Sequence, residues 1–359
     1  MTNTSTTLPA YRSPGTSFSR TCLPALVPSC QEKGQVPGSD FPKETTTQGI
    51  RTQPRHIVTF DLEEHFHASR FDSPMRGRHW SSFRSRIHTN VAQILELLAQ
   101  HSTKATFFAL GWLAEQHPSV IHAVSAAGHE IACLGYGHEL VAAQTQQSFR
   151  QDIHRAKRIL EDVTGHQVIG FRAPSLSITA HTPWALPIVA EEGFLYDSSV
   201  LPIVHDLAGI PGANQWIHRL SWEERCLWEV PPSTLNVGGF RIAIGGGGYL
   251  RALSYPVLKS LLSRIEAFDK PIVVYIRSWE IDAAQPRMQD TRLSKFRHYL
   301  NLNKTAGRLH RLLADFQFGP IREVVLPIRE QIRSTSVQAV HDSATGDHLN
   351  RSSQQLAIV

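Results

Sequence analysis

Short apolar runs alternate with longer amphipathic stretches along the middle of the chain. Each run is rich in β-branched or aromatic residues and ends in polar residues or a turn signal, as buried strands do. The pattern predicts strands at 56–63, 105–111, 129–134, 168–174, 194–199, 227–232 and 271–279.

The stretches between these runs place apolar residues at helical spacing. Val91, Ile94, Leu95 and Leu98 recur as the residues of one helix face do. In a later stretch, Leu309 and the apolar residues that follow it indicate a helix that packs on the core. The pattern predicts helices at 91–100, 118–128, 183–193 and 303–319.

A further helix is predicted between a capping signal and a glycine. Ser148 and Gln151 have the spacing of a capping box, and Gly165 supplies a stop signal. The apolar residues between these signals share one face: Phe149, Ile153, Ala156, Leu160 and Val163.

Strands that alternate with helices imply parallel βαβ units and an α/β fold. About seven strands of this kind favour an irregular (β/α)7-type barrel over an open sheet. The glycine run 245–248 follows a strand but opens no evident helix, so it is interpreted as a flexible loop. A dinucleotide-binding fold is therefore excluded.

The two ends of the chain differ in composition from the middle. Residues 1–54 and 331–359 are rich in Ser, Thr, Gln or Pro with little periodicity, and both are predicted to be disordered tails. The ordered part is expected to divide into a barrel domain at 55–280 and a C-terminal extension at 281–330 that packs on the barrel.

Composition narrows the function classes. The net charge is +5, with basic residues spread along the chain, which argues against a nucleic-acid partner. The four cysteines form no CxxC pair, so neither a zinc ribbon nor a disulfide framework is indicated. No apolar run is long enough to span a membrane. The N-terminus lacks the pattern of a secretory signal, which predicts a cytoplasmic location.

Polar side chains follow the carboxyl ends of several predicted strands. The first strand ends in Asp61-Leu-Glu-Glu-His-Phe-His67, and the third leads into Gly-Tyr-Gly-His138. The fourth, fifth and last strands end in Arg172-Ala-Pro174, Tyr-Asp197 and Arg277-Ser-Trp-Glu280. Carboxyl ends of parallel barrel strands share one face, and that face carries active sites.

These stretches resemble the polysaccharide deacetylase family, which has the NodB homology fold of carbohydrate esterases. They are most similar to the subgroup encoded near exopolysaccharide and exosortase (PEP-CTERM) genes. The resemblance covers residues 56 to 326 and rests on stretches that include TFDLEEHFH, KATFFALGWLAEQHP, AAGHEIACLGYGHELV, GFRAPSLSI, GGGGYLR, SWEIDAAQPR and LSKFRHYLNLNKTAGRLHRLLADFQFG.

The resemblance implies metal-dependent hydrolysis of acetyl groups on an N-acetylated sugar or exopolysaccharide. A divalent ion, commonly zinc, would activate water for attack on the acetyl carbonyl. Residue by residue, Asp61 matches the base, Arg172 the arginine that orients it, and Asp197 a conformational or acid-pairing position. Tyr136 lies in the loop that would supply the oxyanion N–H. The remaining matches are Pro174 and Trp279 in the sugar groove, and Glu63 or Glu64 with His138 at the metal.

Two positions depart from the family pattern. Leu134 stands where a second metal histidine is expected, and a leucine side chain has no lone pair to offer. Arg277 stands where a histidine acid is expected, and an arginine cannot shuttle a proton near neutral pH. His67 is a candidate to complete the metal site. The alternative function is therefore a catalytically degenerate relative that binds glycan or regulates a partner.

Overall fold

The computed structural model describes residues 55–67, 80–203, 208–222, 225–288 and 291–327. All of them fall in one compact unit, residues 39–359. The two tails expected at the ends of the chain lie outside the described residues.

One sheet of nine strands organises the described part of the chain, with strand order β10-β1-β2-β3-β4-β5-β7-β6 and β11 also pairing with β1. The pairs from β10 to β7 are parallel, and only β6 runs antiparallel to its neighbour β7. The strands are β1 (His56–Leu62), β2 (Thr106–Ala109), β3 (Glu130–Cys133), β4 (Gly170–Phe171), β5 (Tyr196–Asp197), β6 (His218–Trp222), β7 (Arg225–Glu229), β10 (Val273–Arg277) and β11 (Phe318–Gly319).

The predicted α/β fold with parallel strands is confirmed. Within the described residues no pairing joins β6 to β10, so hydrogen bonds do not close the sheet into a ring. A separate hairpin consists of β8 (Leu235–Val237) and β9 (Phe240–Ile242). Strand β1 is buried along its whole length because strands flank it on both edges and helices cover the sheet.

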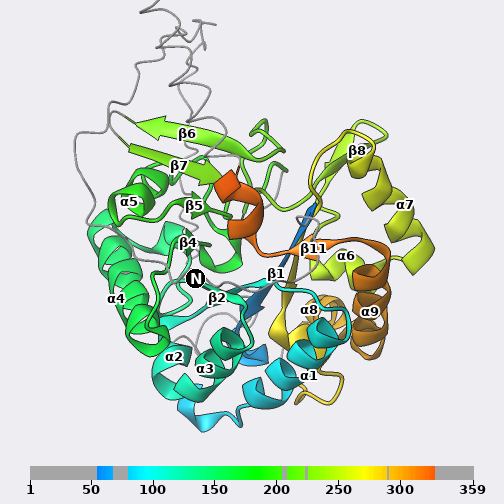
Figure 1. Ribbon diagram of the computed structural model, residues 1–359, viewed down its shortest axis with the longest axis horizontal. Helices are drawn as coiled ribbons and strands as arrows, with labels where there is room; N and C mark the ends of the chain where they lie inside the picture. Colours follow the sequence, from blue (N-terminus) through cyan, green and yellow to red (C-terminus); the bar gives the residue numbers. More distant parts are fainter. Residues whose placement is uncertain (1–54, 68–79, 204–207, 223–224, 289–290, 328–359) are drawn as a thin grey trace, which may run out of the picture. The chain divides into compact units, whose positions relative to one another are not determined.

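Helices lie around the outside of the sheet (Figure 1). The α-helices are α1 (Ile87–Gln100), α2 (Gly111–Gln116), α3 (Pro118–Ala126), α4 (Gln146–Thr164), α5 (Ala185–Glu191), α6 (Gly247–Ala252), α7 (Tyr255–Glu266), α8 (Arg292–Tyr299) and α9 (Thr305–Asp315). The 3-10 turns are η1 (His65–His67), η2 (Trp80–Ser82), η3 (Val141–Ala143), η4 (Pro174–Leu176), η5 (Ser278–Ile281) and η6 (Leu302–Lys304).

Helix α4 begins before the capping box that the sequence suggested. Thr145 is the N-cap, and its hydroxyl accepts a hydrogen bond from the Ser148 amide at 3.1 Å. The Ser148 hydroxyl in turn accepts a hydrogen bond from the Thr145 amide at 2.9 Å. The prediction of a Ser148–Gln151 box was wrong because Ser148 occupies the third helical position. The predicted stop is confirmed, since Gly165 ends the helix with a φ of 69°.

The glycine run 245–248 is a packing feature, and its interpretation as a flexible loop was wrong. Gly246 caps α6, and the two glycines after it form the first turn of that helix. A Cβ on Gly247 would lie 1.8 Å from Glu280 Oε2, whereas a Cβ on Gly248 would meet nothing within 4 Å. Glu280 is fully buried and holds the equally buried Arg251 at 2.9 Å.

None of the described helices is long and apolar enough to cross a lipid bilayer.

Replacing Gly247 with Ala is expected to destabilise the fold by about 1–3 kcal/mol, the usual cost of overpacking a filled interior. The added methyl group must displace Glu280 from Arg251. Gly248→Ala is the matched control, one residue along the same helix, and should leave the melting temperature unchanged or slightly higher because alanine favours helix. Thermal unfolding of both variants checks this, and equal melting temperatures would contradict the packing account.

Candidate active site

Asp61 and Arg172 form a buried ion pair at the carboxyl end of β1. Arg172 Nη1 lies 2.7 Å from Asp61 Oδ1, and the arginine is fully buried. Burial raises the pKa of Asp61, and the charge of Arg172 opposes that rise. Among the described residues, nothing donates a hydrogen bond to the second oxygen of Asp61, so that oxygen is available to a water molecule.

Arg172 is held on every side, so the position of Asp61 is fixed. Its guanidinium donates to the Thr59 hydroxyl at 2.9 Å and to the Ser198 carbonyl and hydroxyl at 3.1 and 2.8 Å. The same group lies 4.0 Å from the centre of the Phe108 ring. These contacts come from β1, β2 and the segment after β5, and they make Arg172 a positioning residue for Asp61.

Glu63 follows β1 directly and is paired from three directions. His138 Nε2 lies 2.8 Å from Oε2, while Arg277 Nε and the Trp279 indole N–H each lie 3.0 Å from Oε1. Burial alone would raise the pKa of Glu63, but His138, Arg277 and Trp279 lower it to about 2. Glu63 is therefore an ionised carboxylate whose two oxygens already have partners.

His138 reaches Glu63 from a strained backbone position. Its φ of 52° lies in the left-handed region, which costs a non-glycine residue on the order of 1 kcal/mol. The loop before it is anchored by Asp152, which accepts the backbone N–H groups of Tyr136 and Gly137 at 2.8 and 3.1 Å. Two N–H groups of the loop expected to supply an oxyanion donor, those of Tyr136 and Gly137, therefore already donate to Asp152.

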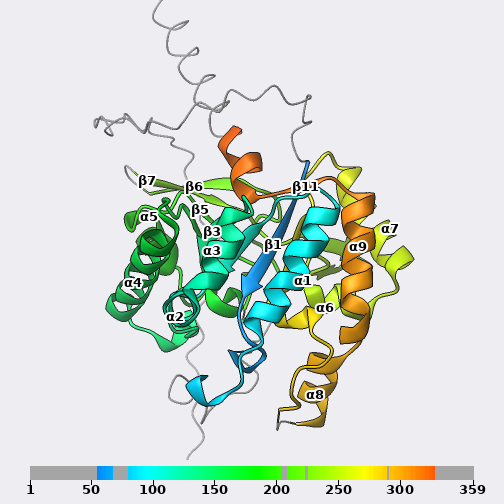
Figure 2. The same ribbon diagram turned by 60° about the horizontal axis from the view of Figure 1, so that its bottom comes forward.

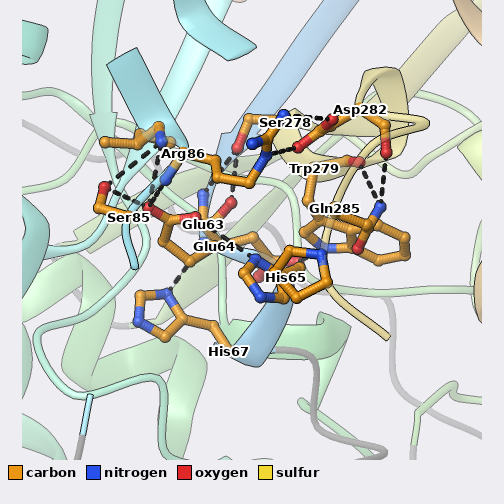
Figure 3. Close-up of polar contacts among 12 residues, drawn as sticks. Glu63, Glu64, His65, His67, Ser85, Arg86, Ser278, Trp279, Asp282 and Gln285 are labelled. Atoms are coloured by element: carbon orange, nitrogen blue, oxygen red, sulfur yellow. Dashed lines mark hydrogen bonds and ion pairs between the residues drawn. The ribbon is translucent and has the colours of Figure 1, made fainter. Parts of the chain in front are cut away.

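Glu64 stabilises a helix terminus (Figure 3). Its Oε1 accepts the backbone N–H groups of Arg86 and Ile87 at 2.8 and 3.1 Å and the Ser85 hydroxyl at 2.5 Å. A carboxylate at the N-terminus of α1 satisfies unpaired amides and complements the helix dipole. The structure thus uses Oε1 of Glu64 to cap α1, while Oε2 has no hydrogen-bond partner among the described residues.

His67 is buried below Glu64, and its orientation decides whether it can bind a metal (Figure 3). Its Nδ1 accepts the Glu64 backbone N–H at 3.2 Å, which places the ring proton on Nε2. Burial lowers the pKa of His67 well below its usual value, so the ring is neutral. A protonated Nε2 is a donor, and this orientation offers no lone pair to a cation.

The other sequence-predicted residues occupy structural positions. Asp197 accepts the Ser199 amide and hydroxyl at 2.9 and 2.6 Å, and it faces Glu229 rather than Asp61. Pro174 is buried in the first position of η4. Trp279 is only 3% exposed and stacks on His298 at 4.0 Å, which contradicts the expected role in an open sugar groove.

Several partners were not predicted from the sequence. Asp152 and Ser198 fix the site loops, and the buried Glu229 accepts the Val200 N–H at 3.1 Å beside Asp197. Glu229 lies within the predicted strand 227–232, and an acidic residue in a buried strand was the one sequence feature that could have marked it as part of the site. Asp152 and Ser198 carry no comparable signal, because a serine or a helical aspartate is common anywhere.

The donor set does not fit the divalent metal that the resemblance implies. Among the described residues, Glu63 and His138 are the pair in direct contact, and Leu134 is 1% exposed within the hydrophobic core. No group of three metal-ligating side chains occurs in the described part of the chain. Charge argues the same way, because Asp61 and Glu63 contribute −2 and Arg172 and Arg277 contribute +2, which sum to zero.

Purified protein equilibrated with zinc and then desalted is expected to retain well below one equivalent of zinc. Two protein ligands leave the ion largely hydrated, whereas three are typical of catalytic zinc. Leu134→His combined with Arg277→His removes the competing cation and adds a donor, and that variant should retain more zinc. Elemental analysis measures both, with thermal melts to verify folding. A full equivalent in the unmodified protein that His138→Ala removes would contradict the account.

Two family models match the chain in succession. Residues 71–190 match the model described as polysaccharide deacetylase, and residues 198–326 match a domain of unknown function, DUF3473. The first match includes β2 to β4, and the second includes β6 to β11 with Arg277 and α8, whereas β1 and β5 lie outside both.

Characterised relatives match over shorter stretches. A peptidoglycan-N-acetylglucosamine deacetylase from Bacillus cereus is 34% identical over 82 residues, which is 23% of this chain and 30% of the relative. A peptidoglycan deacetylase from Helicobacter pylori is 26% identical over 111 residues, 31% of this chain and 37% of the relative. The chain thus spans about a third of the length of these curated relatives.

A solved structure supports the fold over most of the chain. A Mycobacterium smegmatis protein assigned as a polysaccharide deacetylase superposes with a TM-score of 0.52 and 21% identity, covering 79% of this chain and 93% of that one. At this identity the likeness concerns the fold alone. Residues 71–190 are thus similar to the polysaccharide deacetylase family, and the superposition supports the α/β fold.

Proposed function

We propose that this protein hydrolyses the acetamide groups of an N-acetylated carbohydrate polymer. The relatives are named for acting on peptidoglycan and chitooligosaccharide, which supports a polymer of N-acetylated sugars as the substrate class. The observation that carries the proposal is the oriented Asp61–Arg172 pair at the carboxyl end of β1, with one carboxylate oxygen available to water.

In the proposed reaction Asp61 acts as general base. Its free oxygen takes a proton from water, and the oxygen of that water attacks the acetyl carbonyl carbon. The C–N bond then breaks to release acetate, and the sugar nitrogen takes up the proton held by Asp61. Arg172 keeps the carboxylate in place throughout.

Arg277 supplies positive charge beside this base. Its Nε is paired with Glu63, its side chain is 25% exposed, and among the described residues its two terminal nitrogens have no hydrogen-bond partner. A guanidinium cannot protonate a leaving group near neutral pH, but it can donate hydrogen bonds to a carbonyl oxygen that becomes negative. Glu63 and His138 hold Arg277 in that position, and no step in this scheme uses a metal.

We also propose that the chain belongs to the family subgroup encoded near exopolysaccharide and exosortase genes. The run LSKFRHYLNLNKTAGRLHRLLADFQFG supports this placement. An exopolysaccharide would then be the polymer.

Glycan binding without hydrolysis is the second candidate function. One observation favours it: the buried Leu134 occupies a position where the resemblance implies a metal histidine. A protein that lost the metal but kept the surface that contacts the sugar would still bind the polymer.

Asp61→Asn is expected to lower acetate release from N-acetylated chito-oligosaccharides by about 10²-fold or more, the usual contribution of a general base. Arg172→Lys should cause a smaller loss, because lysine keeps the charge without the forked geometry. Acetate release by protein treated with a chelator, together with melting curves, provides the measurement and the folding control.

Hydrolysis is rejected if the unmodified protein releases no acetate above the rate of Asp61→Asn. In that case, calorimetric binding of the same oligosaccharides by the unmodified protein would support glycan binding as the function.

A further inference from the structure

A cationic and aromatic cavity lies on helix α8, outside the site described above. It has a volume of about 510 Å³ and is lined by Arg287, Arg292, Lys295, Phe296, Tyr299 and Leu300. A volume of this size is in the range of sites for small molecules or short oligomers. It belongs to the part of the chain matched by the domain of unknown function.

One face of α8 forms most of the cavity wall. Arg292, Lys295, Phe296 and Tyr299 are spaced as i, i+3, i+4 and i+7, which places them on the same side of a helix. Phe296 is 62% exposed, an unusual exposure for a large apolar ring. The face therefore offers two cations and two aromatic rings to the cavity.

Among the described residues that line it, the cavity is positively charged and has no acidic counter-charge. Arg287, Arg292 and Lys295 form no ion pair with any described residue, although Arg287 lies over the Tyr299 ring at 4.1 Å. Three cations that share a concave surface repel one another, and an anionic ligand would relieve that repulsion.

The cavity wall is fixed in position. The Tyr299 hydroxyl accepts the Met288 N–H at 2.7 Å and donates to the Pro286 carbonyl at 3.2 Å. Met288 in turn packs with Phe66 and Trp80 beside the end of β1. A ring held by two hydrogen bonds is a preformed wall, because little side-chain freedom remains to be lost on binding.

The cavity is connected to the candidate active site through stacked rings. His298, next to Tyr299, stacks on Trp279 at 4.0 Å, and Trp279 donates to Glu63. Figure 2 shows α8 beyond the end of the sheet to which β1 points, and this end carries Asp61 and Glu63. The cavity and the candidate active site therefore lie at the same end of the sheet.

We propose that this cavity is a subsite for an acidic sugar residue, a uronate, of the carbohydrate polymer. Arginine and lysine bind the sugar carboxylate, and Phe296 and Tyr299 pack on the apolar face of the ring. The spread of charge over the whole chain gives no basic stripe of the kind that nucleic acid requires. The proposal rests on the proposed function only in that the ligand is a saccharide.

Calorimetry on the full chain with tetragalacturonate and its methyl ester tests the proposal. The two probes share one sugar skeleton and differ in charge, so the acid should bind about tenfold or more tightly. Arg292→Ala with Lys295→Ala should remove that preference. Arg297→Ala, an exposed cation on the same helix that does not line the cavity, should bind within about twofold of the unmodified protein.

Phe296→Ala separates stacking from charge, because it should weaken both probes while preserving the preference for the acid. Asp61→Asn should leave binding of tetragalacturonate unchanged even where it abolishes acetate release, so failure of the proposed reaction and failure of the subsite give different results. The proposal would be overturned by equal affinity for the acid and the ester, or by an Arg297→Ala variant that loses as much affinity as the Arg292→Ala, Lys295→Ala variant. Tighter binding of a single-stranded oligonucleotide than of tetragalacturonate would also overturn it.

Discussion

A carboxylate removed from water requires positive charge or hydrogen-bond donors, and the arrangement of this site depends on how Glu63 obtains them. Arg277, His138 and Trp279 each contact Glu63, and they come from β10, the loop after β3 and η5. Losing one partner of a buried ionic group typically costs 3–5 kcal/mol, so these segments are tied to a common point. The left-handed backbone of His138 is consistent with a residue held by its partner.

The pairing of Glu63 with Arg277 and His138 also determines which chemistry the site can perform. The guanidinium of Arg277 occupies one oxygen of Glu63, His138 occupies the other, and Leu134 supplies no donor. A divalent ion would enter a cluster whose charges already balance, and it would have to displace a bound cation first. The Asp61–Arg172 pair does not depend on that exchange, because its contacts are made with Thr59, Ser198 and Phe108.

Features of the fold and the site could be predicted from the sequence where they depend on neighbouring residues, and not where they depend on distant segments. The strand of β1 and the stop of α4 at Gly165 were predicted because apolar pattern and helix stops are local signals. The role of Glu64 was not predicted, because its partner Ser85 lies 21 residues away and any acid after a strand reads as a candidate ligand. The glycine run was misread because its reason, the buried Glu280, comes from a distant segment.

The central claim is that Arg277 and His138 satisfy Glu63 without a metal. The most direct measurement is an anomalous difference map from crystals grown with zinc, recorded on both sides of the zinc absorption edge. The account predicts Arg277 Nε against Glu63 and no zinc peak between Glu63 and His138. A strong peak at that point, with Arg277 moved away from Glu63, would contradict it.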